Sequence, residues 1–296
     1  MARDITTRVQ VPVVPAEYAK ERADFEKFVA YMNQKTAQIG MTQSHFQDAA
    51  GMDSLTTARD LLKLMVYARK YPVLNNVWMT KTHTLSVAGD NARQMDCVSK
   101  STHPDLDTYY CSVGKKGGTM DSTRLNMWIY NLAVFLEIPG SDDLLAVVAM
   151  YAPDGNQLPN NRFHATKQVA DIAMALHNDP NADISDMPVC CENAIAALIP
   201  AHGGDYTVLY EKNADALGRP MSISKVLTAV CILDHITDLR EKITYHALDT
   251  LIGGFYIKDY LPGDVVSYED ALYALMLESS NVTAQALARS VGAGME

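Results

Sequence analysis

The chain has few cysteines, and they are not arranged as a disulfide framework or a zinc site. The five are Cys97, Cys111, Cys190, Cys191 and Cys231. An odd number without a C-x-x-C pair argues against both kinds of site. The histidines form no H-x-x-x-H pair, and no carboxylate residue lies at metal-ligand spacing from them. We therefore expect no metal and no other cofactor, and at most one disulfide, Cys97 to Cys111, if their strands are neighbours.

Long apolar segments and basic clusters are also missing. No run approaches the ~18 uninterrupted apolar residues of a membrane-spanning helix, and the opening residues MARDITTRVQ lack the apolar region of a signal peptide. A formal net charge of −10 argues against nucleic acid or an anionic membrane surface as a partner. The sequence contains no glycine-rich phosphate loop.

The 296 residues instead contain some segments with a helical pattern and others with a strand pattern. Apolar residues at helical spacing predict helices over 24–38, with Asp24 as the cap, and over 56–71 and 164–177. Two continuous apolar runs, IYNLAVFLE and DLLAVVAMYA, predict a hairpin in the middle of a covered sheet.

A polar, proline-containing segment at 178–192 has the composition of a linker. After it, AIAALIPA and YTVLYEKNA predict a second hairpin, followed by a helix after Pro220 and helices at about 267–278 and 281–291. Strands and helices mix without a regular βαβ alternation, which favours an α+β fold with an antiparallel sheet covered by helices.

Ser222 and Lys225 are three residues apart at the predicted start of a helix. Positions i and i+3 share a helix face, so the amine can reach the serine oxygen. A neutral lysine there would activate the serine as an acylating nucleophile. On spacing alone a capping serine beside a solvated lysine is commoner, and Ser112 and Lys115 show the same spacing.

Two further segments carry polar residues that suit catalysis. In ESSN, Ser279 and Asn281 are either helix caps or a proton-relaying hydroxyl and a substrate-holding amide. In GKKGGT, residues 114–119, the lysines and glycines form either an exposed turn or an edge strand without side-chain bulk, against which a substrate backbone can lie.

Together these segments resemble the S-x-x-K, S-x-N and K-T-G motifs of penicillin-binding proteins and β-lactamases. Longer stretches, including YTVLYEKNADALGRPMSISKVLTAVCILDH and FVAYMNQKTAQIGMTQSHFQDAAGM, resemble the D-alanyl-D-alanine carboxypeptidase family of low-molecular-weight penicillin-binding serine peptidases. The resemblance covers roughly residues 24–177 and 193–292. It implies the DD-peptidase/β-lactamase-like fold.

The order of the motifs differs from that of the family, in which S-x-x-K comes first and K-T-G last. This predicts one catalytic domain over 1–296 in circularly permuted order. Residues 24–177 would correspond to the family's C-terminal half, 193–296 to its N-terminal half, and 178–192 would join them. Domain termini often lie close together, which makes such a join tolerable. A trimmed tandem gene pair and deliberate engineering would give the same order.

The third motif also departs from the family. If Lys116 is the motif lysine, Gly117 replaces the threonine and Gly118 is the motif glycine. Starting at Lys115 would instead place a lysine at the threonine position. We prefer the first register because Asn126 then falls where the family has a Tyr-Asn pair.

The resemblance implies acyl transfer to a peptidoglycan pentapeptide. Ser222 would attack the carbonyl between two D-alanines, with Lys225 as the base. Ser279 would relay the proton to the leaving amine and Asn281 would orient the substrate. β-Lactam antibiotics would acylate the same serine.

The strand of the third motif would bind the substrate's carboxylate end. Lys116 would attract the carboxylate beside Gly117 and Gly118, and Thr119 would partly replace the missing threonine. Backbone N–H groups of Ser222 and Thr119 would form the oxyanion hole.

Two alternatives remain open. The glycine at 117 and the reordered chain favour a non-catalytic module that binds peptidoglycan or a protein partner. A β-lactamase is less well supported, because no E-x-x-L-N segment supplies a deacylating carboxylate. The family resemblance implies an extracytoplasmic location, periplasmic or secreted.

Overall fold

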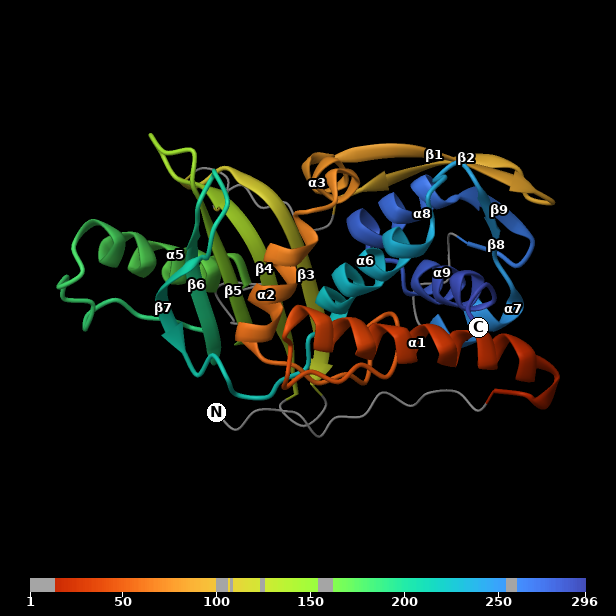
Figure 1. Cartoon of the computed structure of the whole chain (residues 1–296), viewed down its shortest axis with the longest axis horizontal. Coiled ribbons are helices and arrows are strands. Elements are labelled where there is room, and N and C mark those ends of the chain that lie inside the picture. The colour runs from red at the N-terminus through yellow and green to blue at the C-terminus, as the bar shows by residue number, and fades with distance from the viewer. Residues whose placement is uncertain (1–13, 100–105, 107–108, 123–125, 154–161, 254–259) are drawn as a thin grey trace.

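The computed structural model describes residues 14–99, 106, 109–122, 126–153, 162–253 and 260–296. These residues form two antiparallel sheets with helices packed between and around them (Figure 1). The predicted α+β class is confirmed.

The larger sheet has the strand order β3-β4-β5-β6-β7, and every neighbouring pair is antiparallel. Its strands are β3 (Ser112–Ser122), β4 (Met127–Glu137), β5 (Leu144–Pro153), β6 (Asn193–Ile199) and β7 (Thr207–Lys212). Both hairpins predicted from the sequence are confirmed as β4–β5 and β6–β7. The segment between β5 and β6 includes a helix and the predicted linker, yet these two strands pair directly.

Helices cover both faces of this sheet, which explains the continuous apolar sequence of β5. Leu145, Val147 and Ala149 pack in a cluster with α5 (Arg162–Asn178). Their neighbours Ala146, Val148 and Met150 belong to the main core with α2 (Ala58–Ala68). Successive side chains of a strand point to opposite faces, so a strand between two helical layers is apolar at every position.

The main core lies between the sheet and a group of helices. These are α1 (Ala19–Ile39), α3 (Pro72–Met79), the short η2 (Met221–Ser224), α6 (Lys225–His235), α7 (Ala247–Gly253), α8 (Tyr268–Tyr273), the π-helical turn η3 (Ala274–Glu278) and α9 (Asn281–Gly292), with a short turn η1 (Ala16–Tyr18) at the start. The smaller sheet borders this group, with the order β2 (Arg93–Val98), β1 (Thr82–Gly89), β9 (Asp264–Ser267) and β8 (Lys242–Thr244).

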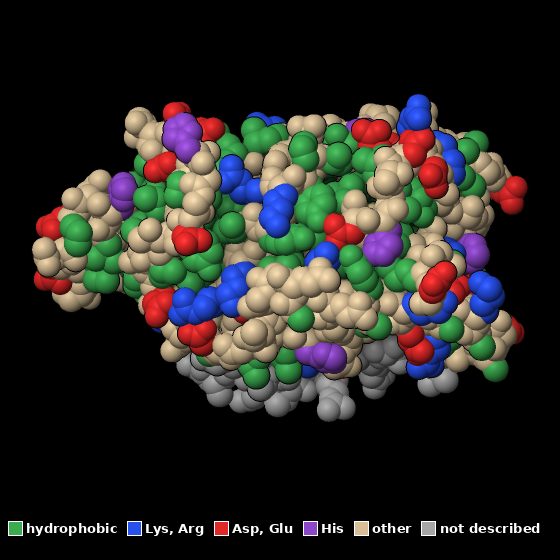
Figure 2. Space-filling model, in the orientation of Figure 1, with side chains coloured by type: hydrophobic (Ala, Val, Ile, Leu, Met, Phe, Trp, Pro, Cys, Tyr) green, Lys and Arg blue, Asp and Glu red, His purple; other side chains and the backbone are tan. Residues whose placement is uncertain are grey.

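Charged side chains are distributed unevenly over the face shown in Figure 2. Several Lys and Arg side chains lie where Figure 1 shows α2. On α2 itself, Arg59 pairs with Glu211 and Asp215, and Lys63 pairs with Asp60. These basic residues are therefore used in ion pairs within an acidic chain.

Helix α1 begins earlier than the sequence predicts. It starts at Ala19, so Asp24 lies inside the helix, where its carboxylate accepts a hydrogen bond from Lys20 Nζ at 2.9 Å. The prediction that Asp24 caps the helix was wrong, because the first turns of α1 carry polar residues that show no apolar period.

The end of α9 packs closely against the start of α1, and Figure 1 places the C-terminus beside α1. A Cβ atom added to Gly292 would lie 1.8 Å from the carbonyl oxygen of Asp24. Lys27 Nζ donates a hydrogen bond to the carbonyl oxygen of Met295 at 2.8 Å. Only a glycine permits this crossing distance.

A carboxylate at the end of α6 joins three helical segments. Asp234 accepts hydrogen bonds from Tyr31 at 3.0 Å and Tyr71 at 2.5 Å and pairs with Lys35 Nζ at 2.7 Å. Burial by itself raises the pKa of Asp234, but the bonds from Lys35, Tyr71 and Tyr31 outweigh burial, and the pKa is lowered. The ionised carboxylate therefore stabilises the fold.

Within the described ranges, no helix has the length and apolar character needed to cross a membrane. Cys97 and Cys111 are both free thiols, the first buried in β2 and the second exposed ahead of β3. The pKa of Cys97 is raised to about 12, chiefly by burial.

Replacing Gly292 by alanine should destabilise the protein by about 1–3 kcal/mol, because the new methyl group would overlap the backbone of α1. Chemical denaturation at pH 7 measures this change. Gly294→Ala is a matched control, since an added Cβ there meets its nearest atom at 3.5 Å. Equal stability of the two variants would contradict the close packing of α1 and α9.

Replacing Asp234 by asparagine should make the free energy of unfolding less dependent on pH in the acid range. A carboxylate with a lowered folded-state pKa contributes stability above its unfolded pKa of about 3.9, and this contribution is lost as pH falls through the folded value. The free energy of unfolding should therefore fall more steeply below about pH 4 in the parent than in Asp234→Asn. Urea denaturation at several pH values tests this, with the exposed Asp186→Asn as the control. Parallel curves for the parent and Asp234→Asn would disprove it.

Candidate active site

Ser222 and Lys225 are in direct contact at the junction of η2 and α6. Lys225 Nζ lies 2.9 Å from Ser222 Oγ. The lysine side chain is fully buried, whereas Ser222 is partly exposed. Met221, just before the serine, has a positive φ of 54°, a strained conformation for a residue with a side chain. The arrangement presents the hydroxyl to solvent and holds the amine behind it.

The S-x-N segment lies beside the same lysine. Lys225 Nζ donates to Asn281 Oδ1 at 2.7 Å. Ser279 follows η3 in the left-handed conformation, with φ 62° and ψ 35°. The residue that caps α9 is Ser280, whose hydroxyl accepts a hydrogen bond from the N–H of Thr283. Helix capping therefore accounts for Ser280 and leaves the side chains of Ser279 and Asn281 for other roles.

Strand β3 brings a second buried lysine to this cluster. Lys116 is 1 % exposed, and its Nζ donates to Ser279 Oγ at 2.8 Å and to the carbonyl oxygen of Gly117 at 3.0 Å. Lys115 points elsewhere and bonds Ser112 Oγ at 2.8 Å. Of the two registers weighed for the third motif, the one beginning at Lys116 places a lysine against the S-x-N serine.

Gly118 is the point at which β3 touches the serine segment. A Cβ atom there would lie 2.9 Å from both Met221 Cβ and the carbonyl oxygen of Pro220, and 3.2 Å from the backbone nitrogen of Ser222. β3 is also the terminal strand of the larger sheet. An edge strand without side-chain bulk can pair with an extended peptide.

A residue that the sequence did not single out lies next to Thr119. The exposed Thr119 accepts a hydrogen bond from Arg162 Nη2 at 2.6 Å. Arg162 is 8 % exposed, with its guanidinium 4.8 Å from the ring centroid of Tyr130. Burial lowers the pKa of Arg162 to about 10. No motif or apolar period marks this arginine, because it precedes the predicted helix as an isolated basic residue.

An asparagine on β4 holds the segment ahead of the serine. Asn131 is fully buried, and its Nδ2 donates to the carbonyl oxygen of Arg219 at 2.8 Å. Its Oδ1 accepts from the N–H of Tyr151 at 2.9 Å, and the hydroxyl of Tyr151 accepts from the N–H of Arg219 at 2.8 Å. Asn126, which we used to choose the register, lies in the turn before β4 with φ 49°. For the register of the third motif, Tyr130 and Asn131 of β4 were a more informative Tyr-Asn pair than Asn126.

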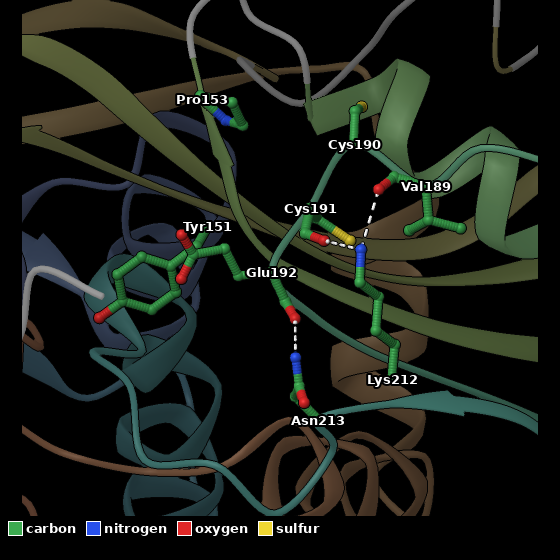
Figure 3. A pocket seen from close by; sticks show the side chains of 8 residues that line it. All are labelled: Tyr151, Pro153, Val189, Cys190, Cys191, Glu192, Lys212 and Asn213. Carbon is green, nitrogen blue, oxygen red and sulfur yellow. Dashed lines mark hydrogen bonds between the residues drawn. The ribbon is translucent and has the colours of Figure 1, made fainter. Parts of the chain in front are cut away.

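A shallow pocket of about 320 Å³ lies away from this cluster, at the ends of β5 and β7 (Figure 3). Lys212 Nζ donates there to the carbonyl oxygens of Val189 and Cys191, and Asn213 donates to that of Glu192. None of the motif serines and lysines lines it. These bonds anchor the linker to the sheet.

Among the residues with described positions, no three or more His, Cys, Asp and Glu side chains are grouped so that they could hold a metal ion. A serine faces an amine that can take its proton, and a second hydroxyl lies against a second amine. This arrangement suits nucleophilic catalysis by serine.

A family model matches the part of the chain that carries the third motif. Residues 20–125 match a family model described as D-alanyl-D-alanine carboxypeptidase, and this stretch includes Lys116, Gly117 and Gly118. No curated protein and no solved structure matches the chain. Residues 20–125 are therefore similar to the D-alanyl-D-alanine carboxypeptidase family.

Proposed function

We propose that this protein is a serine-type D-Ala-D-Ala carboxypeptidase that works through an acyl-enzyme on Ser222. The observation that carries the proposal is the 2.9 Å contact between Ser222 Oγ and the buried Lys225 Nζ. Proteins of this family act on peptidoglycan peptides, bind β-lactams and are generally extracytoplasmic cell-wall enzymes.

In the acylation step, Ser222 Oγ attacks the carbonyl carbon between the two D-alanines while Lys225 accepts the hydroxyl proton. The tetrahedral intermediate collapses, the peptide C–N bond breaks, and a proton passes to the leaving amine. Ser279 would relay this proton from Lys225, and the bond that its Oγ accepts from Lys116 supports a place for this hydroxyl in the same cluster. Water then hydrolyses the ester and regenerates Ser222.

The edge of β3 supplies the substrate-binding surface. The peptide backbone would pair with β3 beside Gly118, with the side-chain amide of Asn281 orienting it from the other side. The N–H groups of Ser222 and Thr119 would stabilise the oxyanion, a contribution typically worth about 10²–10³ in rate per donor. The position of Gly118 near the nitrogen of Ser222 supports this arrangement.

Carboxylate recognition would depend on charge more than on a threonine hydroxyl. Gly117 offers no side chain, but Lys116 lies next to it and Arg162 holds the hydroxyl of Thr119. Two cationic groups and one hydroxyl along β3 suit the terminal carboxylate of a peptide. Thr119 and Arg162 together would replace what Gly117 lacks.

We also propose that the two segments form one permuted domain. Residues from 24–177 contribute β3, β4 and β5, and residues from 193–296 contribute β6, β7 and the serine-bearing helix. The direct pairing of β5 with β6 and the packing of α9 against α1 support an exchange of the two halves within one fold.

The runner-up function is a non-catalytic module that binds peptidoglycan or a protein partner. The glycine at position 117 favours it, because a site that only binds does not need the threonine hydroxyl. Turnover and covalent capture by penicillin separate the two functions.

Incubation with benzylpenicillin should add the mass of one penicillin to the intact protein. The adduct should be absent from Ser222→Ala, because that variant lacks the nucleophile, and D-alanine release from a D-Ala-D-Ala peptide should be lost as well. Intact mass spectrometry and a D-alanine assay measure both. An unmodified parent protein with a folded circular dichroism spectrum would reject the carboxypeptidase and leave the binding module.

Gly118→Ala should slow acylation by about 10²-fold or more, because the methyl group would push β3 away from the serine segment. The rate of penicillin adduct formation is the measurement. Gly294→Ala, remote from the site and free of overlap, is the matched control. Acylation of Gly118→Ala at the parental rate would contradict the assigned contact between β3 and Ser222.

A further inference from the structure

A short loop between α1 and α2, residues 48–53, lies directly behind the lysine of the S-x-x-K motif. It contacts α6 at two places. The carbonyl oxygen of Ala50 accepts a hydrogen bond from Lys225 Nζ at 3.2 Å. The carbonyl oxygen of Ala49 accepts one from Thr228 Oγ1 at 2.7 Å. The loop comes from the first half of the chain and the lysine from the second.

The side chain of Asp48 determines the shape of this loop. Its Oδ1 accepts hydrogen bonds from the N–H groups of Ala50 at 2.7 Å and Gly51 at 2.6 Å. Its Oδ2 accepts from the N–H groups of Met52 at 2.9 Å and Asp53 at 3.0 Å. One carboxylate thus binds four successive amides, which aligns the peptide planes and points the Ala50 carbonyl away from Asp48.

The loop also packs closely against η2. Gly51 has φ +85°, and a Cβ atom there would lie 2.0 Å from the carbonyl oxygen of Met221 and 2.4 Å from Ser224 Oγ. Arg219 donates to the carbonyl oxygen of Met52 at 3.2 Å and pairs with Asp53 at 2.9 Å. The loop therefore contacts the segment before the serine as well as the lysine.

The Ala50 carbonyl has a chemical consequence for Lys225. A neutral amine has two N–H bonds and one lone pair. Acceptors at Ala50 O and Asn281 Oδ1 can take the two N–H bonds, which leaves the lone pair directed at Ser222 Oγ. Once the serine proton arrives, all three protons of the ammonium have acceptors.

We propose that Asp48 is a positioning residue for the base Lys225, acting through the carbonyl of Ala50. It does not touch the substrate. It holds the acceptor that directs the amine, so the first half of the chain orients the base carried by the second. This inference rests on the proposed function only for its catalytic consequence, since the coupling between Asp48 and Lys225 is measurable in the resting protein.

Besides Asp48, the charged groups on the segments around Lys225 are Lys116 on β3, Asp53 in the loop, Arg219 ahead of η2 and Glu278 before Ser279. None of these four groups is changed in the test. The variants must therefore separate the order of the loop from the charge of Asp48.

The test follows the titration of Lys225 in protein labelled with 13C at lysine Cε, with the resonance assigned by Lys225→Arg. In Asp48→Ala the midpoint should fall by about 0.5 pH unit or more, because the ammonium loses an acceptor. Thr228→Val keeps the charge of Asp48 but frees the Ala49 carbonyl, and it should shift the midpoint in the same direction. Asp249→Asn breaks the buried pair with Arg289 and should leave the midpoint unchanged.

Acylation by benzylpenicillin gives the second readout. The maximal rate should fall about tenfold in Asp48→Ala, and Asp48→Asn, which retains one carbonyl acceptor, should recover part of it. Hydrogen exchange should show faster exchange at the amides of residues 50–53 in Asp48→Ala. An unchanged Lys225 midpoint in both Asp48→Ala and Thr228→Val would overturn the inference. A parent protein that forms no penicillin adduct would reject the proposed function, and the Lys225 titration would still decide this inference.

Discussion

A fully buried lysine is the constraint on which the rest of the structure depends. Removing an amine from water costs several kcal/mol unless polar groups surround it. Lys225 meets this requirement through acceptors from three separate elements: Ser222 in η2, Asn281 at the start of α9 and Ala50 in the loop after α1. Those elements come together only if the helices around α6 pack as they do.

The larger sheet supplies the other half of the cluster. Lys116 projects from β3 toward Ser279, while Gly118 allows β3 to lie against the segment that precedes Ser222. Asn131 and Tyr151, on β4 and β5, hold the backbone of Arg219 in the same segment. Residues far apart in the chain thus meet at one edge of the sheet.

The sequence predicted the elements best where burial imposes a clear period. Both hairpins of the larger sheet were found because strands buried on two faces are continuously apolar. The start of α1 and the helices α3 and α7 were missed, since short or polar helical turns carry little apolar signal. Motif spacing led to the choice of Asn126, but Asn131 is the asparagine that contacts the serine segment. Motif spacing fails here because it takes no account of the length of the β3–β4 hairpin.

The sequence by itself determined the local chemistry: a serine one helical turn from a lysine, a serine and asparagine between two helices, and a lysine followed by glycines on a strand. Local spacing is sufficient for this, because the geometry of one helical turn brings i and i+3 together. Only the tertiary structure decided that Lys116 and not Lys115 reaches Ser279, that Arg162 meets Thr119, and that the loop of Asp48 contacts Lys225. These contacts join residues more than forty positions apart, and packing of the core, not local sequence, sets such distances.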